Sequence, residues 1–341
     1  MIGEPNWRVG LGDYAAALAL SPDGCRVAAG SLAGDAVIID LATGDVDKLS
    51  EHPFGVSCAA WSPDGTRLAT AGHDGVIRLY DSDAQAVGSV EGDGWVAALA
   101  WSPDSLLLGA AAKRALTLIG RDGHTVHRYS DVSSTVTAVA WATNGKRIGV
   151  TSYGGITWYD ADNLPVDTPS RTHQWKGSLL SLAIAPNGRW ACAGAQDASI
   201  HLWRLWSGDD LSMSGYPSKI EHLAFREDSH WMASACLGEI TFWDFSGKGP
   251  KGTRPASGQA HDRHITALTW QPSANILASG CADGRIALWP SPRKPGQQLT
   301  PLASSDDGSG IAALTWHPAG TSILASRADG TIEHRSIRLL A

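Results

Sequence analysis

Residues 58–65 read CAAWSPDG, and variants of this octapeptide return along the whole chain. Close copies are ALALSPDG at 17–24 and LAWSPD at 99–104. The residues that stand directly before the turn occupy positions 20, 61, 101, 141, 184, 225, 270 and 316, so that successive copies are 40 to 46 residues apart. A period of this length, built from short apolar runs, is typical of a β-propeller in which each repeat forms one blade.

One repeat, residues 56–90, shows how a blade would be built. The apolar run 56–61 ends in a Ser-Pro-Asp-Gly turn, where proline presets φ and glycine accepts a positive φ. Further strands are expected at 67–71, 76–80 and 86–90, with a second tight turn at 73–75. Four antiparallel strands form one blade, and blades must stack because a single blade cannot bury both of its faces.

Two repeats carry polar and aromatic side chains at identical spacing. At offsets of 18, 22 and 28 from a histidine, the sets are His52, Thr70, Asp74 and Tyr80, and His261, Ser279, Asp283 and Trp289. With the Trp-Asp pair at 243–244, this pattern resembles the WD40 family, and the resemblance implies that each set forms a hydrogen-bonded chain within its blade. The third, fourth and sixth repeats depart from the pattern at 113–115, 153–155 and 237–239, so we expect those blades to depend on packing and main-chain pairing.

Eight innermost-strand segments predict an all-β, eight-bladed propeller of four-stranded antiparallel blades, which occupies residues 1–341 as a single WD40-type domain. The last repeat ends with 331–337 and lacks a fourth strand, whereas 6–11 precede the first repeat as a spare strand. We therefore expect the N-terminal strand to pair as the outermost strand of the last blade and to close the ring. Seven blades and an irregular segment are the alternative. Residues 247–259 and 291–296 are expected to be extended surface loops.

Composition limits the range of partners. The net charge is −7 and basic residues gather only at 248–254 and 293–294, which argues against binding of nucleic acid across a broad face. No apolar run approaches the length that spans a membrane, and the run 14–20 is too short for a signal peptide. The five cysteines are odd in number and fall mostly within strands, so we expect no disulfide framework and a cytoplasmic location.

The sequence also argues against catalysis. It contains no glycine-rich phosphate loop and no G-x-S-x-G motif, and the expected innermost strands are poor in acids and bases. The richest cluster joins His261, His264, Cys281 and Asp283, with His222 one blade earlier. We interpret His261 as part of the polar chain and Cys281 as a small buried side chain. The prediction is therefore no enzyme, no cofactor and no metal.

Resemblance to WD40 propellers implies that a partner meets the loops that lead into the innermost strands and the turns between the second and third strands. Binding residues concentrate on loops held by a rigid scaffold, and aromatic and arginine side chains anchor interfaces. The residues expected to bind a partner are, from the loops, Phe54, Trp95, Trp175, Lys176, Tyr216, Lys219 and His264, and, from the turns, His73, Arg114, Tyr153, Gln196 and Arg327.

The function expected from these features is a non-catalytic scaffold that binds a protein or peptide on its loop face around the central channel, and that acts alone or as a subunit of a larger complex. The alternative is a propeller that handles a small molecule or a metal through His222, His264, His73 and Cys281.

Overall fold

A computed structural model describes residues 1–130, 132–162, 164–165, 168–272 and 275–338. These residues form strands, turns and loops and contain no helix, and accordingly none of them belongs to a helix that could cross a membrane. Contacts divide the chain into a first unit, Leu11–Leu182, and a second unit, Met1–Gly10 with Ala183–Ala341. Each unit contains four antiparallel sheets, or blades, and the resulting total of eight confirms the predicted number.

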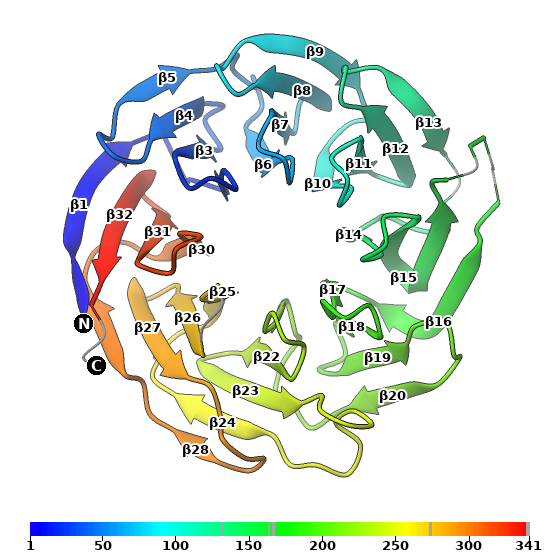
Figure 1. Ribbon diagram of the computed structural model, residues 1–341, viewed down its shortest axis with the longest axis vertical. Coiled ribbons are helices and arrows are strands. Elements are labelled where there is room, and N and C mark those ends of the chain that lie inside the picture. Colours follow the sequence, from blue (N-terminus) through cyan, green and yellow to red (C-terminus); the bar gives the residue numbers. More distant parts are fainter. Residues whose placement is uncertain (131, 163, 166–167, 273–274, 339–341) are drawn as a thin grey trace. The chain divides into compact units, whose positions relative to one another are not determined.

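The first unit holds blades 1 to 4, which follow one another from blue to green in Figure 1. Blade 1 contains β2 (Ala17–Leu20), β3 (Arg26–Gly30), β4 (Ala36–Asp40) and β5 (Val46–Lys48). Blade 2 contains β6 (Val56–Trp61), β7 (Arg67–Gly72), β8 (Val76–Asp81) and β9 (Ala86–Glu91). Blade 3 contains β10 (Val96–Trp101), β11 (Leu107–Ala112), β12 (Ala115–Gly120) and β13 (Thr125–Tyr129). Blade 4 contains β14 (Ala138–Trp141), β15 (Arg147–Asp160) and β16 (Arg171–Ser178).

Blade 4 departs from the four-stranded pattern because β15 occupies the place of both middle strands. Its first half pairs with β14, and its second half pairs with β16. Gly154 and Gly155, in the middle of β15, have positive φ values of 101° and 129°. A Cβ on Gly149 would lie 3.0 Å from the indole of Trp158, so the two halves of the strand pack against each other.

The second unit holds blades 5 to 8. Blade 5 contains β17 (Ala183–Ile184), β18 (Trp190–Gly194), β19 (Ile200–Arg204) and β20 (Asp210–Met213). Blade 6 contains β21 (His222–Phe225), β22 (Trp231–Cys236), β23 (Glu239–Asp244), β24 (Ala256–Gln259) and β28 (Gln298–Leu299). Blade 7 contains β25 (Ile265–Trp270), β26 (Ile276–Cys281), β27 (Arg285–Pro290) and β29 (Ala303–Asp306). Blade 8 contains β30 (Ile311–Trp316), β31 (Ser322–Arg327), β32 (Thr331–Ile337) and β1 (Ile2–Gly10).

The position of β1 confirms that the N-terminal strand completes the last blade. It runs antiparallel to β32, from Ile2 opposite Ile337 to Gly10 opposite Thr331. The strand begins four residues earlier than the predicted start at Asn6. Without β1, the edge of β32 would present unpaired N–H and C=O groups to solvent.

The predicted loop at 247–259 is partly wrong, because its last four residues form β24, the fourth strand of blade 6. Residues 291–296 lead into β28, which adds a parallel fifth strand to the same blade through Ser257 and Gly258. The sequence did not reveal either strand because Gly, Lys and Pro obscure the alternation of apolar residues.

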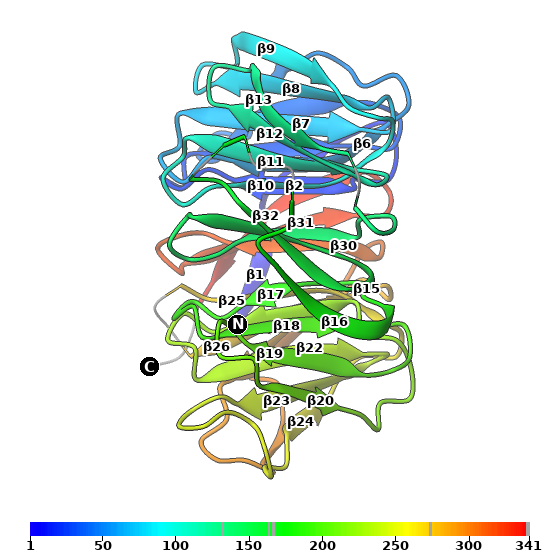
Figure 2. The same cartoon turned by 90° about the vertical axis from the view of Figure 1, so that its right-hand side faces the viewer.

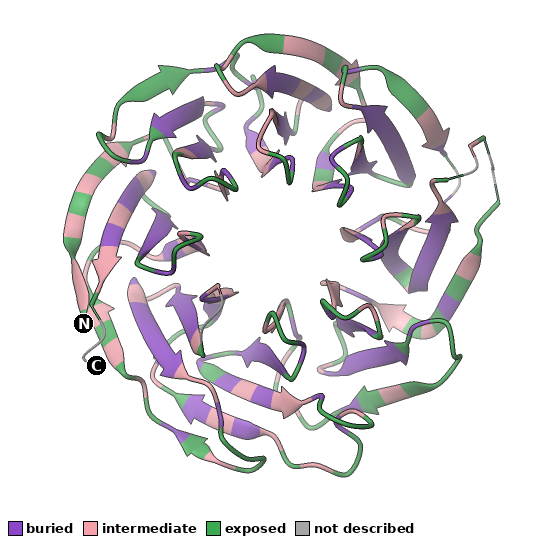
Figure 3. Ribbon diagram, in the orientation of Figure 1, coloured by how far each residue is buried: buried purple, intermediate pink, exposed green. Residues whose placement is uncertain are grey.

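Burial follows the order of the strands within a blade. Second and third strands such as β7 and β12 are largely buried. Of the outermost strands, β5 is exposed and β9 alternates between exposed and intermediate residues, as the colours of Figure 3 show. The side view of Figure 2 shows how closely the strands of blades 2 and 3 stack. The apolar faces of adjacent blades therefore form the core, with alanine-rich strands allowing close approach.

A recurring hydrogen bond joins innermost strands of neighbouring blades. The indole Nε1 of Trp101 donates to the carbonyl of Ala60 at 3.0 Å, and that of Trp141 to Ala100 at 2.8 Å. In the second unit, Trp270 and Trp316 make the same bond to Ala224 and Thr269 at 3.0 and 3.1 Å. The tryptophan before the turn therefore links neighbouring blades at these four positions. Nε1 of Trp61 has no partner among the described residues, and positions 20, 184 and 225 hold Leu, Ile and Phe.

Deletion of residues 1–10 should strongly destabilise blade 8, because it uncovers the edge of β32 and removes the contact of Arg8 with buried Glu333. We expect a lower melting temperature and association at high protein concentration. A synthetic peptide of residues 1–11 should reverse both effects when added in excess. A deletion variant that melts like the intact chain would contradict this role of β1.

Candidate interaction surface

Blade 2 contains a chain of polar side chains, which we call its polar chain. Nε2 of His52 lies 3.0 Å from Oγ1 of Thr70, and its Nδ1 lies 3.0 Å from a carboxylate oxygen of Asp74. Burial lowers the pKa of His52, which favours the neutral form of its imidazole. Arg78 donates a second bond to Asp74 at 2.8 Å, whereas the hydroxyl of Tyr80 makes no hydrogen bond. The chain fixes the loop before β6 against the turn between β7 and β8.

The matching chain of blade 7 is interrupted. Nε2 of His261 lies 2.7 Å from Oγ of Ser279, which also accepts a bond from Nε1 of Trp289 at 2.8 Å. Nδ1 of His261 has no hydrogen-bond partner among the residues that the structure describes, and Asp283 accepts bonds from main-chain N–H groups instead. Burial lowers the pKa of His261 to about 4 and raises that of the neighbouring Cys281 to about 11.

Blade 6 uses a tyrosine where blades 2 and 7 use a histidine. The Tyr216 hydroxyl lies 3.0 Å from Oγ of Ser234 and 3.0 Å from Oγ1 of Thr241, and it accepts a bond from Nε1 of Trp243 at 2.7 Å. Ser234 is 18 residues after Tyr216, which is the spacing of the polar chain. The hydroxyl of Tyr216 therefore lies inside the blade, although the residue is partly exposed, and its contact with a partner stays a prediction.

Blade 8 replaces the polar chain with ion pairs. Glu333 is fully buried and accepts bonds from Arg327 at 2.6 Å and from Arg335 at 2.8 Å, and Arg335 also binds Asp307. Burial alone would raise the pKa of Glu333, but the two guanidinium groups lower it. Arg327 is only 2% exposed, so its predicted contact with a partner was wrong. The sequence does not show that the carboxylate of Glu333 draws this arginine inward.

In the first unit, the predicted loops and turns meet at one surface. A Cβ on Gly55 would lie 2.7 Å from the carbonyl oxygen of Leu32 in the turn of blade 1. A Cβ on Gly75 would similarly lie 3.0 Å from Cα of Gly94 in the loop before blade 3. Gly55 and Gly94 have φ values of +95° and +110°, which favour glycine. Each loop therefore rests on the turn of the preceding blade.

These contacts bring exposed side chains from three blades together. Phe54 is 71% exposed and Trp95 is 58% exposed. The main-chain N–H of His73 donates to Gly55 at 3.0 Å, and its ring meets the ring of Trp95 edge-on at a centroid distance of 4.7 Å. The surface formed by Leu32, Phe54, His73, Trp95 and Lys113 is called the aromatic patch below.

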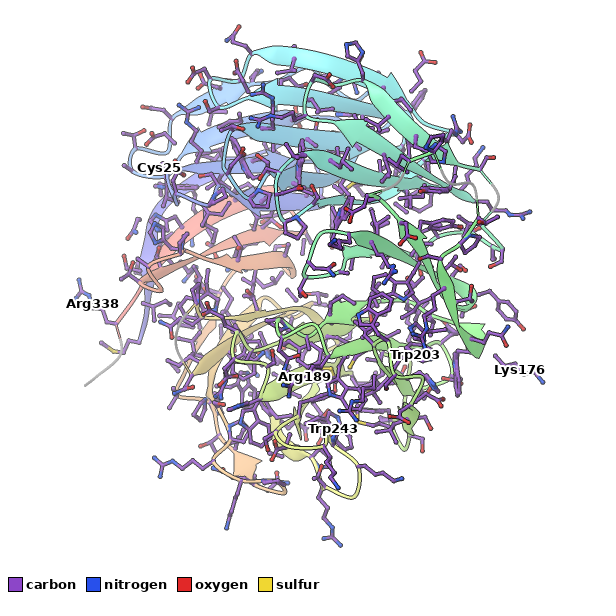
Figure 4. The ribbon with its side chains drawn as sticks, turned by 45° about the vertical axis from the view of Figure 1, so that its right-hand side comes forward. Cys25, Lys176, Arg189, Trp203, Trp243 and Arg338 are labelled. Carbon is purple, nitrogen blue, oxygen red and sulfur yellow. The ribbon has the colours of Figure 1, made fainter. Side chains whose placement is uncertain are left out.

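Blade 4 places the next group of predicted residues around a cavity of about 570 Å³. Tyr153, Trp175 and Lys176 line it, and Lys176 extends away from the ribbon in Figure 4. Arg114 is exposed in the turn of blade 3, where its Nε donates to the carbonyl of Val132 at 2.9 Å. Tyr153 and Lys176 are exposed and Trp175 is partly exposed in blade 4, whereas Arg114 directly follows Lys113 of blade 3 in the chain.

In the second unit, Lys219 and His264 line a cavity of about 290 Å³ together with Glu221 and His222. Lys219 pairs with Glu221 at 2.8 Å, and burial lowers the pKa of His222. Gln196 is exposed in the turn of blade 5. Cys281, which the alternative function grouped with these histidines, lies beside His261 instead.

Two members of the aromatic patch were missed. Leu32 is 41% exposed in the turn of blade 1, and the side chain of Lys113 covers Gly94, with Cε 2.8 Å from the position of a Cβ there. Both occupy turns between second and third strands, where His73 was predicted. The position of Leu32 and Lys113 in these turns was enough to predict their exposure. Leu32 was missed because the prediction considered mainly aromatic and charged side chains.

Comparison with solved structures defines the fold class. The C-terminal WD40 domain of Sif2 superposes with a TM-score of 0.82 at 18% identity and covers 99% of each chain. Together with the eight sheets, this likeness makes the fold an eight-bladed β-propeller and excludes the seven-bladed alternative.

Three stretches of the chain match a known repeat family. Residues 44–81, 168–204 and 252–290 match the model of the WD domain, G-beta repeat, and each match ends with the third strand of a blade. WD repeat-containing protein slp1 of Schizosaccharomyces pombe is 27% identical over 190 residues, covering 51% of this chain. Small ribosomal subunit protein RACK1z of Arabidopsis thaliana is 26% identical over 125 residues, covering 32% of this chain. The chain spans only 37% and 38% of the lengths of these two relatives, respectively.

The Tyr216→Phe variant should lose stability although it changes only one oxygen atom. The loss leaves the polar groups of Ser234, Thr241 and Trp243 without their shared partner. We expect a decrease of roughly 1–3 kcal/mol in the free energy of unfolding, measured by chemical denaturation. Tyr153→Phe is the control, because that side chain is 56% exposed. Equal stability of the two variants would show that Tyr216 is not a structural member of blade 6.

Stability should also fall in mild acid. Burial lowers the pKa values of His52, His201 and His222 below the ordinary value of 6.5. Unfolding therefore takes up protons below about pH 6.5, and each unit of pKa depression is worth about 1.4 kcal/mol. The free energy of unfolding should decrease as the pH falls from about 6.5 toward the lowered pKa values, and the contribution of these histidines should level off below them. Denaturation curves across this range check the slope, which should be shallower for His52→Gln. A slope of the opposite sign would refute the prediction.

Proposed function

We propose that this protein is a non-catalytic scaffold that binds a protein or peptide partner through the aromatic patch. The observation that carries the proposal is the contact of His73 with Trp95, flanked by Phe54 on the neighbouring loop. Three blades contribute to one surface, so the partner would bind to a framework that is already in place.

The composition of the patch favours a polypeptide partner. Large apolar side chains that are exposed together, with polar groups around them, mark interaction sites. Tryptophan supplies much binding energy at the centre of protein interfaces, and Lys113 offers a charge at the edge of the patch. Tyr153, Trp175 and Lys176 would extend the contact for a longer peptide.

The comparisons support this role at the level of the fold. The chain is similar over part of its length to slp1, a WD repeat-containing protein, and to RACK1z. We further propose that neither nucleic acid nor a membrane is the partner and that the protein acts in the cytoplasm. Its five cysteines are all free thiols, which suits a reducing compartment.

The test compares partners captured by three tagged forms of the whole protein from its own cell extract. The wild type and Trp206→Ala should capture the same stoichiometric protein, because Trp206 is exposed but lies in a turn outside the patch. Phe54→Ala/Trp95→Ala should lose that protein by at least about tenfold while it melts within a few degrees of the wild type. Retention of the partner by this folded double variant would refute the proposed surface.

A further inference from the structure

Three potential metal ligands converge in blade 7, where the loop before β25 meets the turn between β26 and β27. One ring nitrogen of His261, Sγ of Cys281 and one carboxylate oxygen of Asp283 all lie within 4.8 Å of one another. We propose that these three side chains bind a zinc ion, which completes the interrupted polar chain of the blade.

The free imidazole nitrogen is the first argument for a ligand at this place. His261 is only 3% exposed, and its Nδ1 makes no hydrogen bond. Burial of a polar atom without a partner is costly because the atom loses its bonds to water, so native proteins rarely leave one unsatisfied. Nε2 is engaged with Ser279, which leaves Nδ1 as the nitrogen that can bind an ion.

Blade 2 provides a comparison within the same chain. There, Nδ1 of His52 lies 3.0 Å from Asp74, and the position equivalent to Cys281 is Gly72. In blade 7, a thiol occupies that position and the bond between histidine and aspartate is missing. The blade that carries the thiol is therefore the one that lacks the bond between histidine and aspartate, which blade 2 retains.

The donor set suits zinc. Nitrogen, sulfur and carboxylate oxygen are its usual ligands, and a soft thiolate disfavours magnesium and calcium. Two ligands of a tetrahedral zinc ion are separated by roughly 3.3–3.8 Å, given the usual zinc–ligand distances. Side-chain shifts of about 1 Å would bring the three atoms to this spacing. Asp283 is only partly buried, which leaves room for water as a fourth ligand.

Surrounding groups already hold the ligands in position. Ser279 orients His261 through Nε2 and is itself fixed by Trp289, as second partners commonly orient metal-bound histidines. The nearby cation, Arg285, is engaged with Asp262 at 3.4 Å and with Asp306 at 3.0 Å, so two carboxylates outside the cluster offset its charge.

Binding requires that the thiol of Cys281 lose its proton to solvent as the zinc–sulfur bond forms, and no oxidant or reductant takes part. The sequence led us to expect no metal here because the spacing assigns His261 to a complete polar chain. In the described structure, Nδ1 of His261 makes no bond to Asp283, so the polar chain of blade 7 is incomplete.

The test uses the full chain after removal of metal with a chelator. Titration with zinc should show one site per molecule and raise the melting temperature. Cobalt(II) should give the visible bands of a tetrahedral site and a thiolate-to-cobalt band. Loss of a group that only orients a ligand weakens metal binding by about 10- to 100-fold. Cys281→Ser, which removes a ligand, should therefore lose at least about 100-fold in zinc affinity.

Cys236→Ser is the matched control, because this buried thiol belongs to blade 6 and has the carbonyl of Ser218 at 3.4 Å as a partner. It should bind zinc like the wild type. Equal zinc binding by Cys281→Ser, or stoichiometric zinc binding that is absent altogether, would overturn the proposal. Should Cys281→Ser fail to fold, a wild-type cobalt spectrum without the thiolate band would overturn it equally. None of these outcomes depends on the aromatic patch.

Discussion

The indole-to-carbonyl bond between neighbouring innermost strands is the constraint on which the rest of the structure depends. Trp101 and Trp141 in one unit, and Trp270 and Trp316 in the other, each donate to the strand of the preceding blade. The ring fills the space between two alanine-rich sheets, while the bond fixes their register. Hydroxyl groups on the innermost strands donate to the following blade instead. Ser57 donates to the carbonyl of Val96 at 2.7 Å, and Thr266 donates to that of Ile311 at 2.6 Å.

Once the blades are fixed in this way, the inside of each blade tolerates different chemistry. One position in the loop before the innermost strand holds His52, Tyr216 or His261, and Asp307 takes it in blade 8. The third-strand side chain that completes the bridge changes accordingly. Trp289 reaches His261 through Ser279, whereas Trp243 bonds Tyr216 directly and Arg335 binds Asp307. The shared requirement is a polar bridge between that loop and the body of the blade, whichever atoms supply it.

Much of the fold could be predicted from the sequence because its determinants are local and repeated. The Ser-Pro-Asp-Gly turns mark the ends of strands, and their spacing counts the blades, while the unpaired last repeat indicates where β1 must pair. The candidate site was harder to predict. Phe54, His73 and Trp95 are exposed, as their positions predict, and their contact with a partner stays a prediction. Arg327 was placed on the surface because charge usually means exposure. Only the fold brings Glu333 beneath that arginine, as it brings Ser234 and Thr241 to Tyr216.

The pairing of β1 with β32 also determines how the molecule bears tension. The main chains of Met1 and Arg338 are hydrogen-bonded, so the start of β1 and the end of β32 lie at the same end of the paired strands. Force applied through these two points would part the ladder one pair at a time, like a zipper, instead of shearing all pairs at once. Resistance to pulling along this direction is therefore low, although the same pairing contributes much to stability at rest. The thermodynamic stability and the mechanical strength of the pairing between β1 and β32 are therefore separate properties.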